Sequence, residues 1–174
     1  MRHHSFGDGR HVLRLDPGED VVGILRQVAQ EQHITAGTLS GLGSVDEITL
    51  GFLDAVANEY TKRRFEERME VAALSGSISM EEDRPHIHLH AVVAPREFLA
   101  YAGHVHEAKV GATLEIYITT LPAALRRVQV EGLAFPRLLL PGEPVPAPDK
   151  SGKPPPTPAK SVSRGPKKDG TGGR

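Results

Sequence analysis

Residues 86–94 (HIHLHAVVA) alternate histidine with an apolar residue over their first six positions. Successive side chains of a β-strand point to opposite faces of a sheet, so the three histidines share one face. Ile87, Leu89 and Ala91 share the other face, which we expect to be buried. Residues 112–121 (ATLEIYITTL) alternate in the same way. The chain is therefore predicted to build a sheet with one apolar and one polar face.

A helix is predicted ahead of most of the strands, over residues 17–32. Asp16 can cap it, Pro17 suits the first helical position, and Glu19 lies three residues after the cap. Apolar residues then recur at helical spacing, at Val21, Leu25, Val28 and Ala29.

The rest of the first 140 residues consists mainly of short β-rich segments separated by glycine. Residues 95–111 are expected to form a loop with a helical turn. One helix followed by many short strands is typical of the α+β class. We predict a compact domain with a mostly antiparallel β-sheet flanked by one main N-terminal helix.

The composition changes at residue 141. Residues 1–140 carry 14 Lys and Arg against 19 Asp and Glu, whereas residues 141–174 carry 7 against 3 and hold 9 of the 14 prolines. A segment with so few apolar side chains cannot offset the entropy lost on ordering. We predict a folded domain over 1–140 and a disordered, basic Pro/Gly/Lys-rich tail over 141–174. This tail either contacts DNA phosphates non-specifically or serves only to keep the protein in solution.

The sequence excludes several classes of protein. It contains no cysteine, which excludes disulfides, thiolate nucleophiles and every zinc site with a cysteine ligand. No apolar run approaches the roughly 18 residues that span a bilayer. The N-terminal residues lack the apolar stretch of a secretory signal. We expect a soluble cytoplasmic protein with no membrane partner.

Five of the nine histidines lie between positions 86 and 106, and three of these share one strand face. Same-face neighbours on a strand are about 6.6 Å apart, so two adjacent rings can converge on one ion, whereas His86 and His90, about 13 Å apart, cannot. His88 is therefore one ligand, paired with either His86 or His90.

A third ligand must come from another segment. His104 is the preferred candidate because it follows Gly103, which lets the backbone approach closely, and His106 is the reserve. Three imidazoles without a carboxylate cradle suit Zn²⁺ or another divalent transition metal such as Ni²⁺, Co²⁺ or Cu²⁺, and not Mg²⁺ or Ca²⁺. The alternative is a row of solvated histidines on an exposed strand.

Two carboxylates are weaker candidates. Glu115 shares a strand face with Thr113 and Tyr117, and Glu70 lies between Met69 and Val71. Glu115 could act as a general base or support a metal ligand, but a solvated strand carboxylate is the simpler interpretation for both.

The order of motifs over residues 10–133 closely resembles the PPC (plants and prokaryotes conserved) domain. The resemblance is carried by PGED before the helix, the GLGSV turn, the strand with MEV and SGSIS, then HxH, GH and TxE. It implies a compact α+β fold with an antiparallel sheet, a homotrimer, and in prokaryotic members a metal site of three histidines.

Carried over residue by residue, the resemblance implies that the ligands are His88, His90 and His104. The family has two glycines before the last histidine, and here the first of them is Ala102. His86 and His106 fall outside the pattern. Glu70 and Glu115 match glutamate positions of the family, without an assigned role.

The resemblance also brings a DNA-binding label, which descends largely from plant members with AT-hook motifs ahead of the domain. Residues 163–168 (SRGPKK) are at best a degenerate match to such a motif. We predict a homotrimeric, metal-binding PPC-domain protein with a DNA-binding or regulatory role. The alternative is a metal-dependent enzyme, hydrolase or lyase-like, that uses the open coordination position of a three-histidine zinc site for water or a small-molecule ligand.

Overall fold

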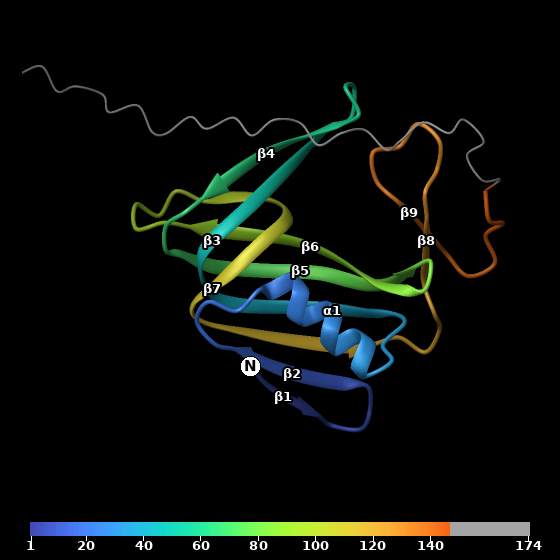
Figure 1. The fold of residues 1–174 in the computed structure, drawn as a ribbon, viewed down its shortest axis with the longest axis horizontal. Coiled ribbons are helices and arrows are strands. Elements are labelled where there is room, and N and C mark those ends of the chain that lie inside the picture. Colours follow the sequence, from blue (N-terminus) through green and yellow to red (C-terminus); the bar gives the residue numbers. More distant parts are fainter. Residues whose placement is uncertain (147–174) are drawn as a thin grey trace, which may run out of the picture.

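The computed structural model describes residues 1–146, so most of the predicted tail, including residues 163–168, lies outside the described residues. Nine strands and one helix make up the described part of the chain (Figure 1). In chain order they are β1 (Arg2–Ser5), β2 (Arg10–Leu15), α1 (Val21–Glu31), β3 (Gly37–Asp54), β4 (Glu59–Phe65), β5 (Met69–Glu81), β6 (Arg84–Ala94), β7 (Tyr101–Thr120), β8 (Arg126–Val128) and β9 (Arg137–Leu139).

The sheet partly closes on itself. Strands β3 and β6 each pair with both β5 and β7, so these four strands form a ring. Strands β1 and β2 extend the sheet beyond β7, β4 pairs with β3, and β8 and β9 extend it beyond β5. Every named pair is antiparallel except β5 with β8. The predicted α+β class and mostly antiparallel sheet are confirmed.

Strands β3 and β7 are long and irregular. Their pairing shifts register three times between Gly43 and Leu50, which is how a long strand turns within a closed sheet. Residues 95–111 were expected to form a loop with a helical turn, and this expectation is wrong from Tyr101 onward. Because β7 finds partners in both β3 and β6, extended pairing overrides the weak local pattern.

The helix begins later than predicted. Gly18 has φ +81°, and its N–H donates to Val110 O at 2.8 Å, while Val110 N–H donates to Glu19 O at 3.0 Å. The backbone at Gly18 and Glu19 is thus paired with β7 and cannot continue a helix. Asp16 N–H does donate to Glu19 Oε2 at 2.8 Å, but this bond closes a turn, and α1 starts only after Asp20.

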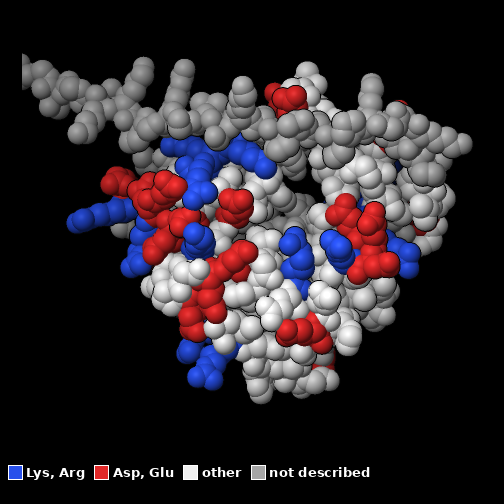
Figure 2. Space-filling view, viewed as in Figure 1, with Lys and Arg blue, Asp and Glu red and all other residues white. Residues whose placement is uncertain are grey.

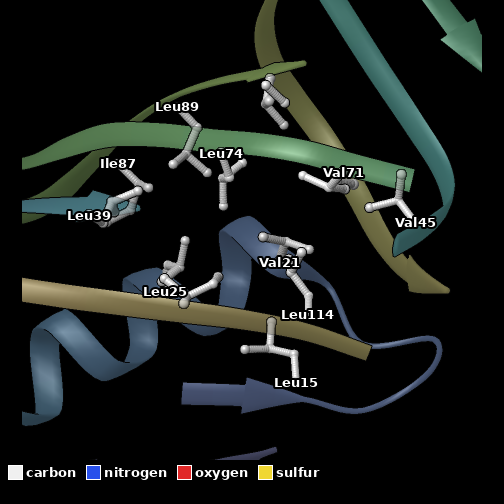
Figure 3. Close-up of a cluster of buried hydrophobic side chains, with 14 of the residues drawn as sticks. Leu15, Val21, Leu25, Leu39, Val45, Val71, Leu74, Ile87, Leu89 and Leu114 are labelled. Carbon is white, nitrogen blue, oxygen red and sulfur yellow. The ribbon is translucent and has the colours of Figure 1, made fainter. Parts of the chain in front are cut away.

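The core lies between α1 and the sheet (Figure 3). The helix contributes Val21, Leu25, Val28 and Ala29, as its spacing predicted. Figure 3 shows Leu25 and Val21 on one side and Leu39, Leu74 and Leu89 of the strands on the other. Burying one such leucine contributes about 1.5–3 kcal/mol.

The alternation in residues 86–94 places the apolar side chains on the buried face of β6, as predicted. Ile87, Leu89, Ala91 and Val93 are buried, which leaves the histidine face of β6 outside this core. Among the described residues, no helix is both long enough and apolar enough to cross a membrane.

Candidate metal centre

Strands β6 and β7 bring three histidines to one point. His90 and His104 are direct cross-strand partners, and His88 lies two residues along β6 on the same face. The ring centroids are 5.2 Å apart for His88 and His90, 5.1 Å for His88 and His104, and 5.5 Å for His90 and His104. One ring nitrogen from each residue lies within 4.8 Å of the other two.

These three side chains fit a transition-metal ion. With zinc–nitrogen bonds of about 2.0–2.1 Å, nitrogens of a tetrahedral site lie about 3.4 Å apart, so nitrogens within 4.8 Å of one another need to approach by about 1.4 Å at most. Nδ1 of His104 is buried and has no hydrogen-bond partner among the described residues. A bound cation is one way to satisfy such an atom. The donor set, all imidazole, suits zinc and its neighbours rather than magnesium or calcium.

The electrostatics keep two of the three rings neutral. Burial, together with the positive charge of the nearby Arg127 guanidinium, lowers the pKa of His88 to about 4. Burial lowers the pKa of His104 to about 3, with His106 and His88 as additional causes. Both rings therefore offer a lone pair at neutral pH, which metal ligation requires.

The other two histidines of the cluster do not join the three converging nitrogens. His86 Nδ1 lies 2.7 Å from Glu81 Oε2. His106 packs edge-on against Tyr60, with ring centroids 5.2 Å apart. Its buried Nε2 lies against Gly51 and, like His104 Nδ1, has no hydrogen-bond partner among the described residues. Of the two pairings that strand geometry left open, the structure brings His88 together with His90.

The two glutamates do not face this centre. Glu70 is exposed on β5. Glu115 accepts a hydrogen bond from the Tyr117 hydroxyl at 3.2 Å. Neither lines the pocket beside the histidines. A general base must lie within hydrogen-bond reach of the reacting group, so the base role considered for Glu115 has no geometric support.

A pocket of about 850 Å³ lies over the three histidines. The β3–β4 hairpin lines one side with Phe52 and Tyr60, α1 contributes Arg26, and residues 134–136 line another side. Figure 2 shows a hollow between the hairpin and the segment that carries β8 and β9. The same view shows acidic and basic side chains interspersed rather than gathered by sign. The three histidines are thus reachable by a small molecule.

Sequence reasoning did not find Arg127 on β8, the lining residue that bonds directly to one of the three histidines. It is 8 % exposed. Its Nε donates to Ser79 Oγ at 3.0 Å, its Nη1 to Pro136 O at 3.0 Å, and its Nη2 to His88 Nδ1 at 3.1 Å. Burial lowers the pKa of Arg127. No local pattern marks this arginine, because its position depends on the pairing of β8 with β5.

Comparison with known proteins identifies the family of this chain. The sequence-family model of the Plants and Prokaryotes Conserved domain, abbreviated PCC or PPC, matches residues 3–122. The chain belongs to this family. The match covers β1 to β7 and therefore includes the three histidines, whereas Arg127 lies beyond it.

Solved structures have the same fold. A candidate DNA-binding protein from Ralstonia eutropha JMP134 is 29 % identical, with a TM-score of 0.73 over 80 % of this PPC chain and 96 % of the other. A metal-containing protein from Archaeoglobus fulgidus is also 29 % identical, with a TM-score of 0.69 over 75 % and 93 %. A PPC protein from Pyrococcus horikoshii, at 20 % identity, has a TM-score of 0.68 over 75 % and 92 %.

Curated relatives are much longer. The bifunctional protein GlmU of Synechococcus sp. (strain JA-2-3B'a(2-13)) is 33 % identical over 112 residues, which is 63 % of this PPC chain and 16 % of the relative. The chain thus spans about a sixth of the length of that relative.

Proposed function

We propose that this PPC protein holds one divalent transition-metal ion, with Zn²⁺ as the first choice, between His88, His90 and His104. The observation that carries the proposal is the convergence of one nitrogen from each ring within 4.8 Å. The similarity to the metal-containing protein from Archaeoglobus fulgidus supports it. Three protein ligands leave a coordination position for a water or a small-molecule ligand.

The strand pairing, the burial of the rings and the pocket each contribute to the proposed metal site. The cross-strand pair His90 and His104 and the neighbouring His88 hold the ion from two strands of a rigid sheet. Burial keeps His88 and His104 unprotonated and ready to bind. The pocket gives a small molecule access to the remaining position. The ion, when bound, supplies Lewis acidity at the base of this pocket.

Substitution by Co²⁺ tests the proposal directly. Purified protein is stripped with a chelator and titrated with Co²⁺, whose visible absorption depends on the ligands and their geometry. We expect a band that saturates near one ion per chain and that is lost on addition of excess Zn²⁺. A titration with no saturable band, together with no zinc in the purified protein, contradicts the proposal.

We further propose that the protein assembles as a homotrimer, as the family resemblance implies. Exposed apolar side chains on the long strands support an assembly, with Phe52 of β3 73 % exposed and Leu42 of β3 54 % exposed. Native mass spectrometry of the full chain, whose mass is 18.8 kDa, is expected to give three chains per particle. A monomer at micromolar concentration contradicts this assembly.

DNA binding is a second proposal, supported by the similarity to the candidate DNA-binding protein from Ralstonia eutropha JMP134. The acidic balance of residues 1–140 makes the basic residues 141–174 the part of the chain suited to phosphates. Deleting residues 141–174 is expected to abolish retardation of duplex DNA at low salt. Unchanged retardation assigns any binding to the domain instead.

A metal-dependent hydrolase or lyase-like enzyme is the alternative, and the pocket of about 850 Å³ beside the histidines favours it over a purely structural ion. Turnover of an ester, phosphate or amide that stops on chelation and returns with Zn²⁺ supports the enzyme. Turnover that chelation leaves unchanged removes the metal centre from the reaction.

A further inference from the structure

Among residues 1–146, Arg127 is a buried cation with no carboxylate in direct contact. Although it is 8 % exposed, no carboxylate oxygen among the described residues lies within 4.0 Å of its guanidinium nitrogens; its partners there are a hydroxyl, a carbonyl and an imidazole. A buried charge is costly unless it is paired. The arginine also lines the pocket over the metal centre. Glu81 acts on Arg127 only from beyond this distance, so an anion in the pocket would supply the direct partner that the described residues do not provide.

The bond from Arg127 to His88 cannot coexist with metal ligation by His88. A guanidinium can only donate, so His88 Nδ1 must supply the lone pair of this bond. A neutral imidazole has one such lone pair. If Nδ1 coordinates the metal, its lone pair is used; if Nε2 coordinates the metal, Nδ1 carries the proton. In both cases Arg127 loses this acceptor and its Nη2–H needs another one.

The rest of the pocket fits an anionic ligand with an apolar body. Arg26 and Lys62 add two positive charges, against the single carboxylate of Glu59. Neither Arg26 nor Lys62 forms an ion pair with another described residue. Phe52 and Phe135 contribute apolar side chains to the wall of the pocket. The charge and the lining therefore both point to a small organic oxyanion rather than to a neutral or cationic ligand.

We propose that Arg127 recognises the oxyanion group of a small organic molecule in this pocket, and that coordination of the metal by His88 frees Arg127 to do so. The inference rests on the proposed metal site and names its ligand class, an organic carboxylate or phosphate ester. The planar guanidinium matches both groups through two parallel hydrogen bonds.

The position of Arg127 is set by the chain beyond the family match. Strand β8 runs parallel to the end of β5, with Glu81 and Arg127 as register partners. Asn58, at the tip of the β3–β4 hairpin, donates to Gly132 O at 2.7 Å and accepts from Ala134 N–H at 3.0 Å. These bonds tie the segment after β8 to the opposite side of the pocket. The oxyanion-recognising arginine is thus held on a fixed wall.

The test measures binding of three probes to the full chain by isothermal titration calorimetry. Benzoate and phenyl phosphate carry the two candidate oxyanions, and benzamide is the neutral control for the apolar ring. Each probe is titrated into zinc-loaded and metal-stripped wild type, and into zinc-loaded Arg127→Met and Arg127→Lys. Arg126→Met is the matched control, because Arg126 is the exposed neighbour on the same strand.

We expect zinc-loaded wild type to bind benzoate or phenyl phosphate at least tenfold more tightly than benzamide, and the tighter of the two identifies the head group. Stripping the metal and replacing Arg127 by Met each weaken oxyanion binding at least tenfold. Arg127→Lys retains part of it. Arg126→Met changes nothing, and benzamide binds all the folded variants alike, which a merely structural role for Arg127 would not produce.

Three results overturn the inference. The first is equal affinity of Arg127→Met and wild type for the oxyanions, and the second is equal affinity of zinc-loaded and metal-stripped wild type. The third is no detectable oxyanion binding by zinc-loaded wild type at millimolar probe concentration. Zinc content is measured on every sample. A wild type with full zinc content but no preference for oxyanions refutes only the role of Arg127 and leaves the metal site standing. A wild type that takes up no zinc refutes the metal site, on which the role of Arg127 rests.

Discussion

Two regions of this protein bring histidines together, and they differ in what the rings do. At the β1–β2 edge, His3 Nε2 and His11 Nδ1 lie 3.1 Å apart, and the two rings stack with an interplanar angle of 20°. At the β6–β7 face, three rings meet at steeper angles, and His104 Nδ1 is buried without a partner. The first pair satisfies itself, whereas the second group keeps a buried nitrogen that the proposed metal ion would satisfy. Proximity of histidines is therefore a weaker sign of a metal site than unsatisfied nitrogens beside a pocket.

The largest effect should separate the two regions by metal content. His104→Ala is expected to reduce bound zinc from close to one ion per chain to near zero, because two imidazoles from one strand hold an ion poorly. His11→Ala should leave the zinc content unchanged. Elemental analysis of both variants, purified side by side, checks this. Equal zinc loss in both would mean that the two regions do not differ as described.

The pH dependence of stability should also distinguish the β6–β7 histidines from the histidines at the β1–β2 edge. In metal-stripped protein, the pKa values of His88 and His104 are about 4 and about 3, below the ordinary 6.5. Between pH 6.5 and 4 the unfolded chain binds protons that the folded chain refuses, so stability falls as the pH falls. We expect Tm to drop on the order of 5 °C over this range after allowance for solvent screening.

The control for this measurement is the double variant His88→Gln with His104→Gln, in which the Tm dependence should become shallower. Part of it should remain, because burial also lowers the pKa of His106 to about 4. The pKa of His11 is also lowered by burial, so His11→Gln should flatten the dependence too, though less. A dependence that only His11→Gln removes would assign the effect to the β1–β2 edge.

Removing Arg127 should strengthen metal binding. Arg127→Met abolishes both the donor that competes for the lone pair of His88 and a nearby positive charge, so zinc affinity should rise roughly threefold to tenfold. Competition with a chromophoric chelator measures the change, with Arg126→Met as reference. A fall in affinity would show that Arg127 supports the metal site rather than competing with it.

The smallest effect is expected at His106. The ring centroids of His106 and His104 are 4.8 Å apart, but His106 does not belong to the group whose nitrogens converge. His106→Ala should retain full zinc content with an affinity within about threefold of wild type. Loss of zinc in this variant would extend the metal site beyond three histidines.

Local patterns predicted the parts of this structure that local chemistry decides. The alternation at 86–94 gave the correct faces of β6, and helical spacing gave the buried side of α1. The pattern alone could not choose between His86 and His90, because that choice depends on the register of β6 with β7. The late start of α1 has the same cause, since Gly18 is held by Val110, far along the chain.

Arg127 shows the limit of such reasoning most clearly. Its neighbours Ser79, His88 and Pro136 come from three other segments, and only the parallel pairing of β8 with β5 assembles them. A doublet of arginines in a short strand carries no signal of this, because surface arginines are far more common than buried ones.

The two hydrogen bonds of Asn58 join residues 74 and 76 positions apart. The floor of the pocket is built from β6 and β7, whereas this remote stretch closes its side. Substitutions at Gly132 or Ala134 would therefore reshape this wall while the pairing of β6 with β7 keeps His90 and His104 opposite each other. The selectivity of the pocket for its ligands can in this way be tuned from a segment that holds none of the three imidazoles.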